Sequence, residues 1–141
     1  DTDTDSHLEL PLLQHSRERL ESLELQPFRT LIPEGISSVM TAHLLIPALD
    51  EQWPATLSAN VLTTLLRVDL GFKGLVVTDA LVMEAIAARY GAGEAAVLAF
   101  AAGADPKSAV DQCAQSRCYG DRHCGHDPGG TNGRLPASIV P

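Results

Sequence analysis

Two short stretches of this chain carry side chains that are suited to acid–base chemistry. Asp5-Ser6-His7 places a carboxylate two residues before an imidazole. In a loop, such an aspartate can hold the tautomer of the ring and raise its basicity, as general acid–base catalysis requires. Asp79 closes the apolar stretch GLVVTD, and the carboxyl ends of parallel strands carry functional groups in α/β folds. The plain alternatives are a solvated chain end for Asp5 and His7, and a helix N-cap for Asp79.

The residues between these stretches begin with a helical pattern. Ser16 is a suitable N-cap, and the run SRERLESLELQPFRTLI that it opens has apolar residues at helical spacing. Pro27 is expected to separate a short helix from a second one, and Gly35 to end the second. Residues 36–41 are expected to form a strand, and residues 42–57 a loop.

The alternation then repeats. Ser58 is expected to cap a helix that stops at Gly71, with three leucines along one face: Leu62, Leu65 and Leu66. Residues 73–81, KGLVVTDAL, form a continuous apolar run that is typical of a strand buried on both faces of a parallel sheet. Two more helical stretches are expected up to residue 105, broken at Gly91 and Gly93.

This order of elements predicts an α/β fold with a parallel sheet. Closed barrels and open doubly wound sheets both fit the order, which does not decide between them. Met40 and Met83 are expected to fill gaps in the core.

Composition narrows the class of protein. The chain has 141 residues, a formal net charge of -8, 45% hydrophobic and 20% charged residues, which fits one globular domain. The acidic excess and the lack of a Lys/Arg cluster argue against a nucleic-acid partner. No apolar stretch approaches the roughly 20 residues that span a bilayer. Residues 1–112 lack cysteine, which fits a cytoplasmic location.

Residues 106–141 differ from the rest in character. They have no apolar periodicity and carry a Gly-Gly pair, four prolines and all three cysteines: Cys113, Cys118 and Cys124. This tail is expected to be disordered or foreign to the fold, as a frameshift would make it. Its cysteine spacing fits no common zinc pattern, so no metal site is predicted.

Four motifs together identify a family. DTDTDSHLELP, ISSVMTAHLLIPALD, PATLS and LGFKGLVVTDALVMEAI, in this order and at this spacing, resemble the β-N-acetylhexosaminidase branch of glycoside hydrolase family 3. The resemblance covers residues 1–105. It implies part of a (β/α)₈ TIM barrel, from the loop after strand five through helix seven. It also implies removal of terminal β-linked N-acetylglucosamine with retention of configuration, which bacterial members use in cell-wall recycling.

The resemblance also assigns roles. Asp79 corresponds to the family's nucleophile, His7 to its acid/base and Asp5 to the partner of that histidine. Asp79 would attack the anomeric carbon while His7 protonates the leaving oxygen, and His7 would then activate water. The route needs neither metal nor cofactor, and a small carbohydrate is the implied partner. The oligomeric state stays open.

Three other functions stay open. A neutral imidazole does not repel an incoming anion as a carboxylate would, so phosphate could replace water and make the reaction a phosphorolysis. Family 3 β-glucosidases fit less well, because they commonly lack the DSH loop. A non-catalytic remnant, or a partner for a complementary barrel fragment, is the alternative from outside the enzymes.

Two further residues have two interpretations each. His43, at the end of the strand that precedes Asp79, is expected on the same edge of the sheet. It could bind substrate by lining the sugar pocket, or it could hydrogen-bond a neighbouring loop. Trp53 could stack on a sugar ring or cover the core.

Two segments that the family has next to these motifs are not matched in this sequence. The family has a Lys-His-Phe-Pro-Gly-His-Gly run before DTDTDSH, and an apolar eighth strand where Pro106 and Lys107 follow AGAD here. The first five strands of a barrel are thus not matched and the last is replaced. The polypeptide alone is therefore expected to be marginally stable, prone to aggregate and inactive.

Overall fold

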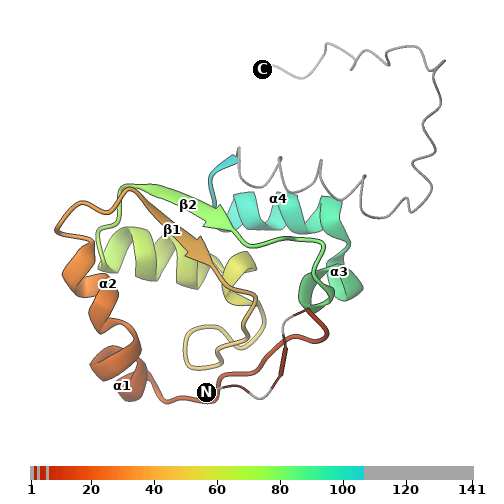
Figure 1. Ribbon diagram of the computed structural model, residues 1–141, viewed down its shortest axis with the longest axis horizontal. Helices are drawn as coiled ribbons and strands as arrows, with labels where there is room; N and C mark the ends of the chain where they lie inside the picture. The colour runs from red at the N-terminus through yellow and green to blue at the C-terminus, as the bar shows by residue number, and fades with distance from the viewer. Residues whose placement is uncertain (1, 3, 6, 107–141) are drawn as a thin grey trace, which may run out of the picture.

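The computed structural model describes residues 2, 4, 5 and 7–106. Figure 1 shows two strands side by side near the middle, with α1 and α2 toward one end and α3 and α4 toward the other. The elements run, in chain order, α1 (Arg17–Arg19), η1 (Leu20–Glu24), α2 (Gln26–Leu31), β1 (Ser38–Thr41), η2 (Ala55–Leu57), η3 (Asn60–Asp69), β2 (Leu75–Thr78), α3 (Glu84–Tyr90) and α4 (Ala92–Ala102).

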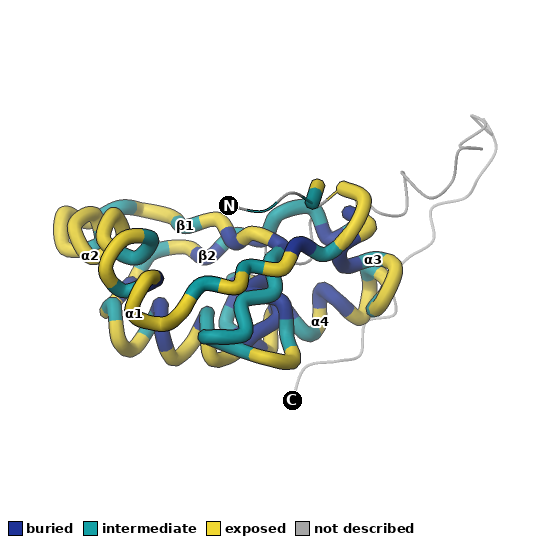
Figure 2. The backbone as a smooth tube through the Cα atoms, turned by 90° about the horizontal axis from the view of Figure 1, so that it is seen from below, coloured by how far each residue is buried: buried dark blue, intermediate teal, exposed yellow. Residues whose placement is uncertain are grey.

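The two strands are parallel, as the alternation of helices and strands predicted. Ser38 lies opposite Leu75 and Thr41 opposite Thr78, so both strands end at the same level. The crossover from β1 to β2 passes through η3, and Figures 1 and 2 place η3 and α4 along one face of the strand pair. The side chains that follow Thr41 and Thr78 therefore share one edge of the sheet.

Local chemistry sets the ends of the helices much as expected. Ser16 Oγ accepts a hydrogen bond from the Arg19 N–H at 3.2 Å, and Ser58 Oγ accepts one from the Val61 N–H at 3.2 Å. Gly71 and Gly91 adopt φ angles of 69° and 68° directly after helices, where a side chain would be strained. The break at Gly93 is wrong, because Gly93 lies inside the first turn of α4.

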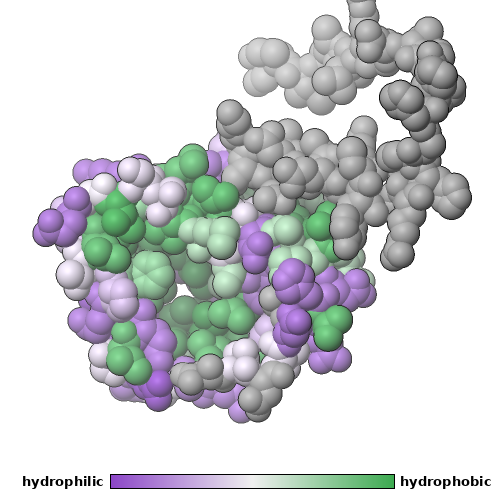
Figure 3. Space-filling model, viewed as in Figure 1, coloured by the Kyte–Doolittle hydropathy of each residue, from purple (hydrophilic) through white to green (hydrophobic). Residues whose placement is uncertain are grey.

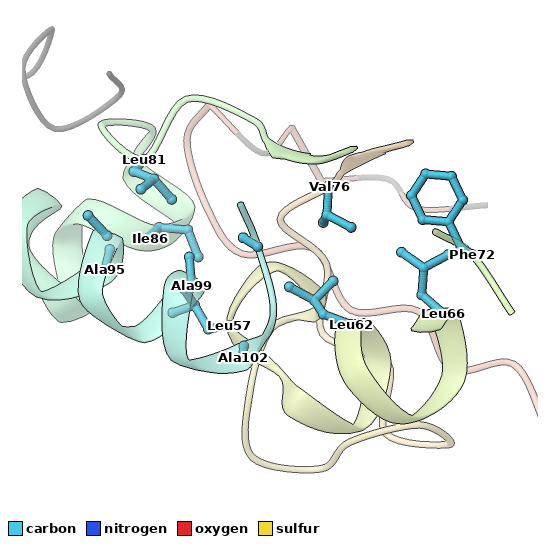
Figure 4. Packing of buried hydrophobic residues seen from close by; sticks show 12 residues of the cluster. Leu57, Leu62, Leu66, Phe72, Val76, Leu81, Ile86, Ala95, Ala99 and Ala102 are labelled. Carbon is cyan, nitrogen blue, oxygen red and sulfur yellow. The ribbon is translucent and has the colours of Figure 1, made fainter. Parts of the chain in front are cut away.

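The core lies between β2 and the helices η3, α3 and α4. Leu62 of η3 is 1% exposed, and Leu65 and Leu66 are buried beside it, which confirms the predicted apolar face. Figure 4 shows Val76 of β2 pointing toward Leu62 and Leu66, while Leu81 and Ile86 meet the alanines of α4. Small residues on α4 let it approach the other elements closely. The buried alanines of α4 are Ala95, Ala96, Ala99 and Ala102.

The opposite surface of the strands is more open than the sequence suggests. Met83 is buried, but Met40 of β1 is 67% exposed, so its expected place in the core is wrong. Leu75 is 46% exposed, so β2 is buried on one face and only partly covered on the other. Figure 3 shows apolar side chains around a hollow. A cavity of about 300 Å³, lined largely by aliphatic side chains, lies beside β1, between Met40 and the apolar face of η3.

One acidic residue, Asp105, binds the backbone groups of β2 that do not pair with β1. Asp105 Oδ2 accepts hydrogen bonds from the Val76 N–H at 2.7 Å and from Arg67 Nη2 at 3.1 Å. The Asp105 N–H in turn donates to the Val76 carbonyl at 3.0 Å. The segment after α4 thus returns to the sheet beside β2, on the side away from β1.

Another acid, Asp50, organises the long loop after β1. Its Oδ1 accepts from the N–H groups of Gln52 at 2.9 Å and Trp53 at 3.0 Å. Its Oδ2 accepts from Ser58 Oγ at 2.6 Å and Asn60 Nδ2 at 3.2 Å. Burial acts to raise the pKa of Asp50, but these hydrogen bonds outweigh it and hold the pKa below its usual value.

We expect Asp50→Ala to lower the free energy of unfolding by about 2–3 kcal/mol, because it leaves two backbone donors and Ser58 without their charged acceptor. A carboxyl group with a lowered folded-state pKa stabilises the fold above its unfolded pKa of about 3.9. This contribution is lost as the pH falls through the folded-state pKa. Urea unfolding at pH 7 and pH 3 measures both effects. Glu51→Gln is the matched control in the same loop, and an equal loss of stability in that variant would contradict the prediction.

Candidate active site

Asp79 directly follows β2 and is partly buried. Its Oδ1 accepts a hydrogen bond from the Ala80 N–H at 2.7 Å. The Ala80 carbonyl accepts from the Met83 N–H at 3.0 Å, which closes the turn that leads into α3. The carboxylate is therefore fixed to a tight turn at the carboxyl end of a strand, where an attacking group can be held rigidly.

His43 follows β1 at the same edge and is 1% exposed. Its Nδ1 lies 2.9 Å from Thr56 Oγ1, and its Nε2 lies 3.0 Å from the Ala80 carbonyl oxygen. Burial lowers the pKa of His43, although the Ala80 carbonyl and the charge of Asp79 act to raise it. The neutral imidazole thus links the loop after β1 to the turn that carries Asp79.

The Asp5–His7 stretch forms a turn of its own. Asp5 Oδ1 accepts a hydrogen bond from the backbone N–H of His7 at 2.9 Å. The Asp5 carbonyl accepts from the N–H groups of Leu8 at 2.9 Å and Glu9 at 3.0 Å. In this conformation the carboxylate organises the main chain around His7, whereas the sequence suggested a bond to the ring. The side chain of His7 is exposed.

Backbone contacts bring this turn to the same edge as Asp79. Leu12 pairs with Leu45 in a parallel bridge, just after His43. The Leu13 N–H donates to the Leu45 carbonyl, and the Leu45 N–H donates to the Pro11 carbonyl, both at 2.9 Å. Figures 1 and 2 show the N-terminal segment passing beside the connection from β2 to α3. The structure therefore places His43 and Asp79 at one end of the strand pair, and holds residues 11–13, which follow the Asp5 and His7 turn, beside the segment after His43.

Trp53 belongs to the core in this structure. It packs against the buried cluster and stacks on Tyr90, with ring centroids 5.6 Å apart and an interplanar angle of 27°. This contact joins the loop after β1 to the end of α3. The structure therefore shows Trp53 covering the core, which was one of its two interpretations.

Two residues of the site, Thr41 and Thr56, could not be identified from the sequence. Thr41 and Thr56 extend the contacts of His43, since Thr41 Oγ1 donates to Thr56 Oγ1 at 3.0 Å. Thr56 lies in the PATLS motif, which contributed to the family resemblance. The motif alone does not indicate what its threonine binds. The partners are 13 and 37 residues from His43, so no local pattern could pair them.

The described part of the chain was predicted to hold no metal site and no membrane span. Among those residues, no group of three or more His, Cys, Asp or Glu side chains is placed to hold a metal ion. No helix found there is long and apolar enough to cross a membrane. The cysteines of the tail, and the boundary of the tail beyond residue 106, lie outside the described residues.

Comparison with known proteins gives a consistent picture. Residues 1–116 match the model of the glycosyl hydrolase family 3 N terminal domain. A beta-hexosaminidase of Neisseria gonorrhoeae strain NCCP11945 is 43% identical over 101 residues, covering 72% of this chain and 28% of that protein. The chain thus spans little more than a quarter of this relative.

Solved structures of beta-N-acetylglucosaminidases and related enzymes are also similar to this chain. A glycoside hydrolase family 3 beta-N-acetylglucosaminidase from Paenibacillus sp. str. FPU-7 is similar, with a TM-score of 0.73 and 50% identity over 85% of this chain and 25% of that one. NagZ from Neisseria gonorrhoeae, in complex with N-trifluoroacetyl-D-glucosamine, has a TM-score of 0.64 and 37% identity, covering 79% of this chain and 34% of that one.

Proposed function

This chain belongs to glycosyl hydrolase family 3, a family with a TIM-barrel-type fold, and on that premise we propose that it carries the nucleophile and the acid/base of a retaining β-N-acetylhexosaminidase. The observation that carries the proposal is the position of Asp79. Its carboxylate accepts a hydrogen bond from the Ala80 N–H at the carboxyl end of β2, and Leu12, five residues after His7, pairs with Leu45 after β1.

The reaction proceeds by two displacements. Asp79 attacks the anomeric carbon and forms a covalent glycosyl-enzyme, while His7 gives its proton to the leaving oxygen. His7 then removes a proton from water, which attacks the same carbon and releases the sugar with its configuration retained. Asp5 shapes the turn that presents His7 to the glycosidic bond.

The proposed substrate is a small carbohydrate with a terminal β-linked N-acetylglucosamine. The relatives support this choice, since one is a beta-N-acetylglucosaminidase and another was solved with N-trifluoroacetyl-D-glucosamine. A cytoplasmic location is part of the proposal and rests on the absence of cysteine from residues 1–112.

A barrel chimera tests the proposal. In it, residues 1–105 of this chain replace the matching segment of the Paenibacillus enzyme, to which this chain is 50% identical. A 5-fluoro N-acetylglucosaminyl fluoride is expected to trap the covalent intermediate, because fluorine slows both displacements while fluoride leaves readily. Mass spectrometry of peptides is expected to find the sugar on Asp79. Label on another peptide, or turnover without any labelled peptide, would contradict the assignment.

Product analysis separates the two reactions that share this geometry. With a chromogenic β-N-acetylglucosaminide and added phosphate, the chimera is expected to release free N-acetylglucosamine. Formation of the 1-phosphate instead would identify a phosphorylase. The 141-residue chain assayed alone, for which the sequence predicts no turnover, serves as the comparison.

A further inference from the structure

A buried chain of hydroxyl and imidazole groups connects β1 to the turn that holds Asp79. Thr41 Oγ1 lies 3.0 Å from Thr56 Oγ1, which lies 2.9 Å from His43 Nδ1. His43 Nε2 then lies 3.0 Å from the Ala80 carbonyl. Thr56 is 0% and His43 1% exposed. Such enclosed groups must satisfy one another, because water does not reach them.

The positions of the protons follow from the partners. A carbonyl only accepts hydrogen bonds, so His43 Nε2 must carry the proton that binds Ala80. Burial keeps the ring neutral, and Nδ1 is then an acceptor that takes the proton of the Thr56 hydroxyl. Thr41 donates to Thr56 in turn. The Ala42 carbonyl, 3.0 Å from Thr56 Oγ1, is satisfied separately by the Leu44 N–H.

This arrangement fixes both polar groups of the Ala80 backbone. Its carbonyl accepts from His43 Nε2 and from the Met83 N–H, while its N–H donates to Asp79 Oδ1. Any rotation of the Ala80 peptide groups would break at least one of these bonds. The orientation of the Asp79 carboxylate is thereby linked to the tautomer of His43.

We propose that His43 is a positioning residue for Asp79, acting through the Ala80 backbone, and that Thr56 and Thr41 hold His43 in the tautomer that does so. The catalytic meaning of this role rests on the proposed function, whereas the tautomer does not. The alternative role of His43 as a sugar ligand is disfavoured, because both of its nitrogens are engaged and its ring is enclosed.

The first test reads the tautomer in the full 141-residue chain. In ¹H–¹⁵N spectra of imidazole-labelled protein, His43 is expected to show a protonated Nε2 and a hydrogen-bonded, unprotonated Nδ1. Thr56→Val keeps the shape but removes the donor, so the Nδ1 signal is expected to shift to that of an unbonded nitrogen. Thr56→Ser is expected to restore the original signal.

Thr78→Val provides the matched control. Thr78 is the residue opposite Thr41 in the sheet and is 1% exposed, yet among the described residues its hydroxyl has no hydrogen-bond partner. The substitution is expected to leave the His43 signals unchanged. A protonated Nδ1, averaged tautomers in the unmodified chain, or an equal response to Thr78→Val and Thr56→Val would overturn the proposal.

The second test measures catalysis in the barrel chimera. Thr56→Val and His43→Ala are expected to lower kcat by up to about 10²-fold, as small misplacements of reacting groups do, with KM changed less than about twofold. His43→Gln, whose amide can still donate to the Ala80 carbonyl, is expected to recover part of kcat. A rise in KM at constant kcat would overturn the positioning role. Full activity after Asp79→Asn would refute the proposed function instead, and would leave the tautomer result standing.

Discussion

Replacing Asp79 by asparagine is expected to lower kcat of the barrel chimera by at least about 10⁴-fold, the scale seen when a nucleophile is removed. The amide oxygen can still accept the hydrogen bond from the Ala80 N–H, so the turn is expected to keep its shape. What is lost is the charge that forms the bond to the anomeric carbon. Steady-state kinetics with an aryl β-N-acetylglucosaminide measure the effect, and circular dichroism checks the fold.

Asp69→Asn is the matched control for this substitution. Asp69 is an exposed residue at the end of η3, before the amino end of β2 and thus at the other edge of the sheet. It is expected to retain full activity. The structure does not support the helix N-cap role for Asp79, because Met83 is the N-cap of α3. If the Asp79→Asn chimera kept more than about a tenth of kcat, a role limited to shaping the turn through the Ala80 N–H would explain position 79 better.

The second large effect concerns His7. His7→Ala is expected to lower kcat by about 10²–10⁴-fold for substrates with a poor leaving group, because no side chain then protonates the leaving oxygen. Substrates with a dinitrophenyl leaving group need little protonation, so their first step is expected to be nearly unaffected. Their slow second step is expected to be rescued by azide, which attacks without a general base.

Leaving-group dependence separates this role from a structural one. A variant that merely disturbed the fold would lose activity on both kinds of substrate alike. His15→Ala, which changes the next histidine along the same segment, is expected to leave both rates unchanged. An equal loss on good and poor leaving groups in His7→Ala would remove His7 from the role of acid.

Local features were the most predictable from the sequence. Ser16, Ser58, Gly71 and Gly91 act through neighbouring backbone groups, and the structure confirms the helix ends that they predicted. Gly93 was misjudged because a glycine in the first turn of a helix is tolerated when its neighbours favour helix. The position of Asp79 after a strand was also predictable, since it depends only on the apolar run before it.

Contacts between distant residues were not predictable. The bond from His43 to Ala80 joins residues that are brought together by the parallel register of β1 and β2, and spacing alone does not give a register. The exposure of Met40 depends on what lies beside β1, which its own sequence does not specify. Asp5 was expected to bind the ring of His7, but the nearer backbone N–H offers a tighter turn.

Pro11 is buried, and the Leu12–Leu45 bridge follows it, so the chain is held in place just after the proposed acid, His7. Pro11 follows His7 by four positions, so the backbone of His7 stays within about 13–14 Å of Pro11 even when the chain between them is fully extended. The region in which the imidazole of His7 can deliver its proton is limited by this distance. The position of the imidazole during proton transfer then depends on the length of the segment between His7 and Pro11. Insertion of a single residue in this segment would shift the imidazole and slow proton transfer.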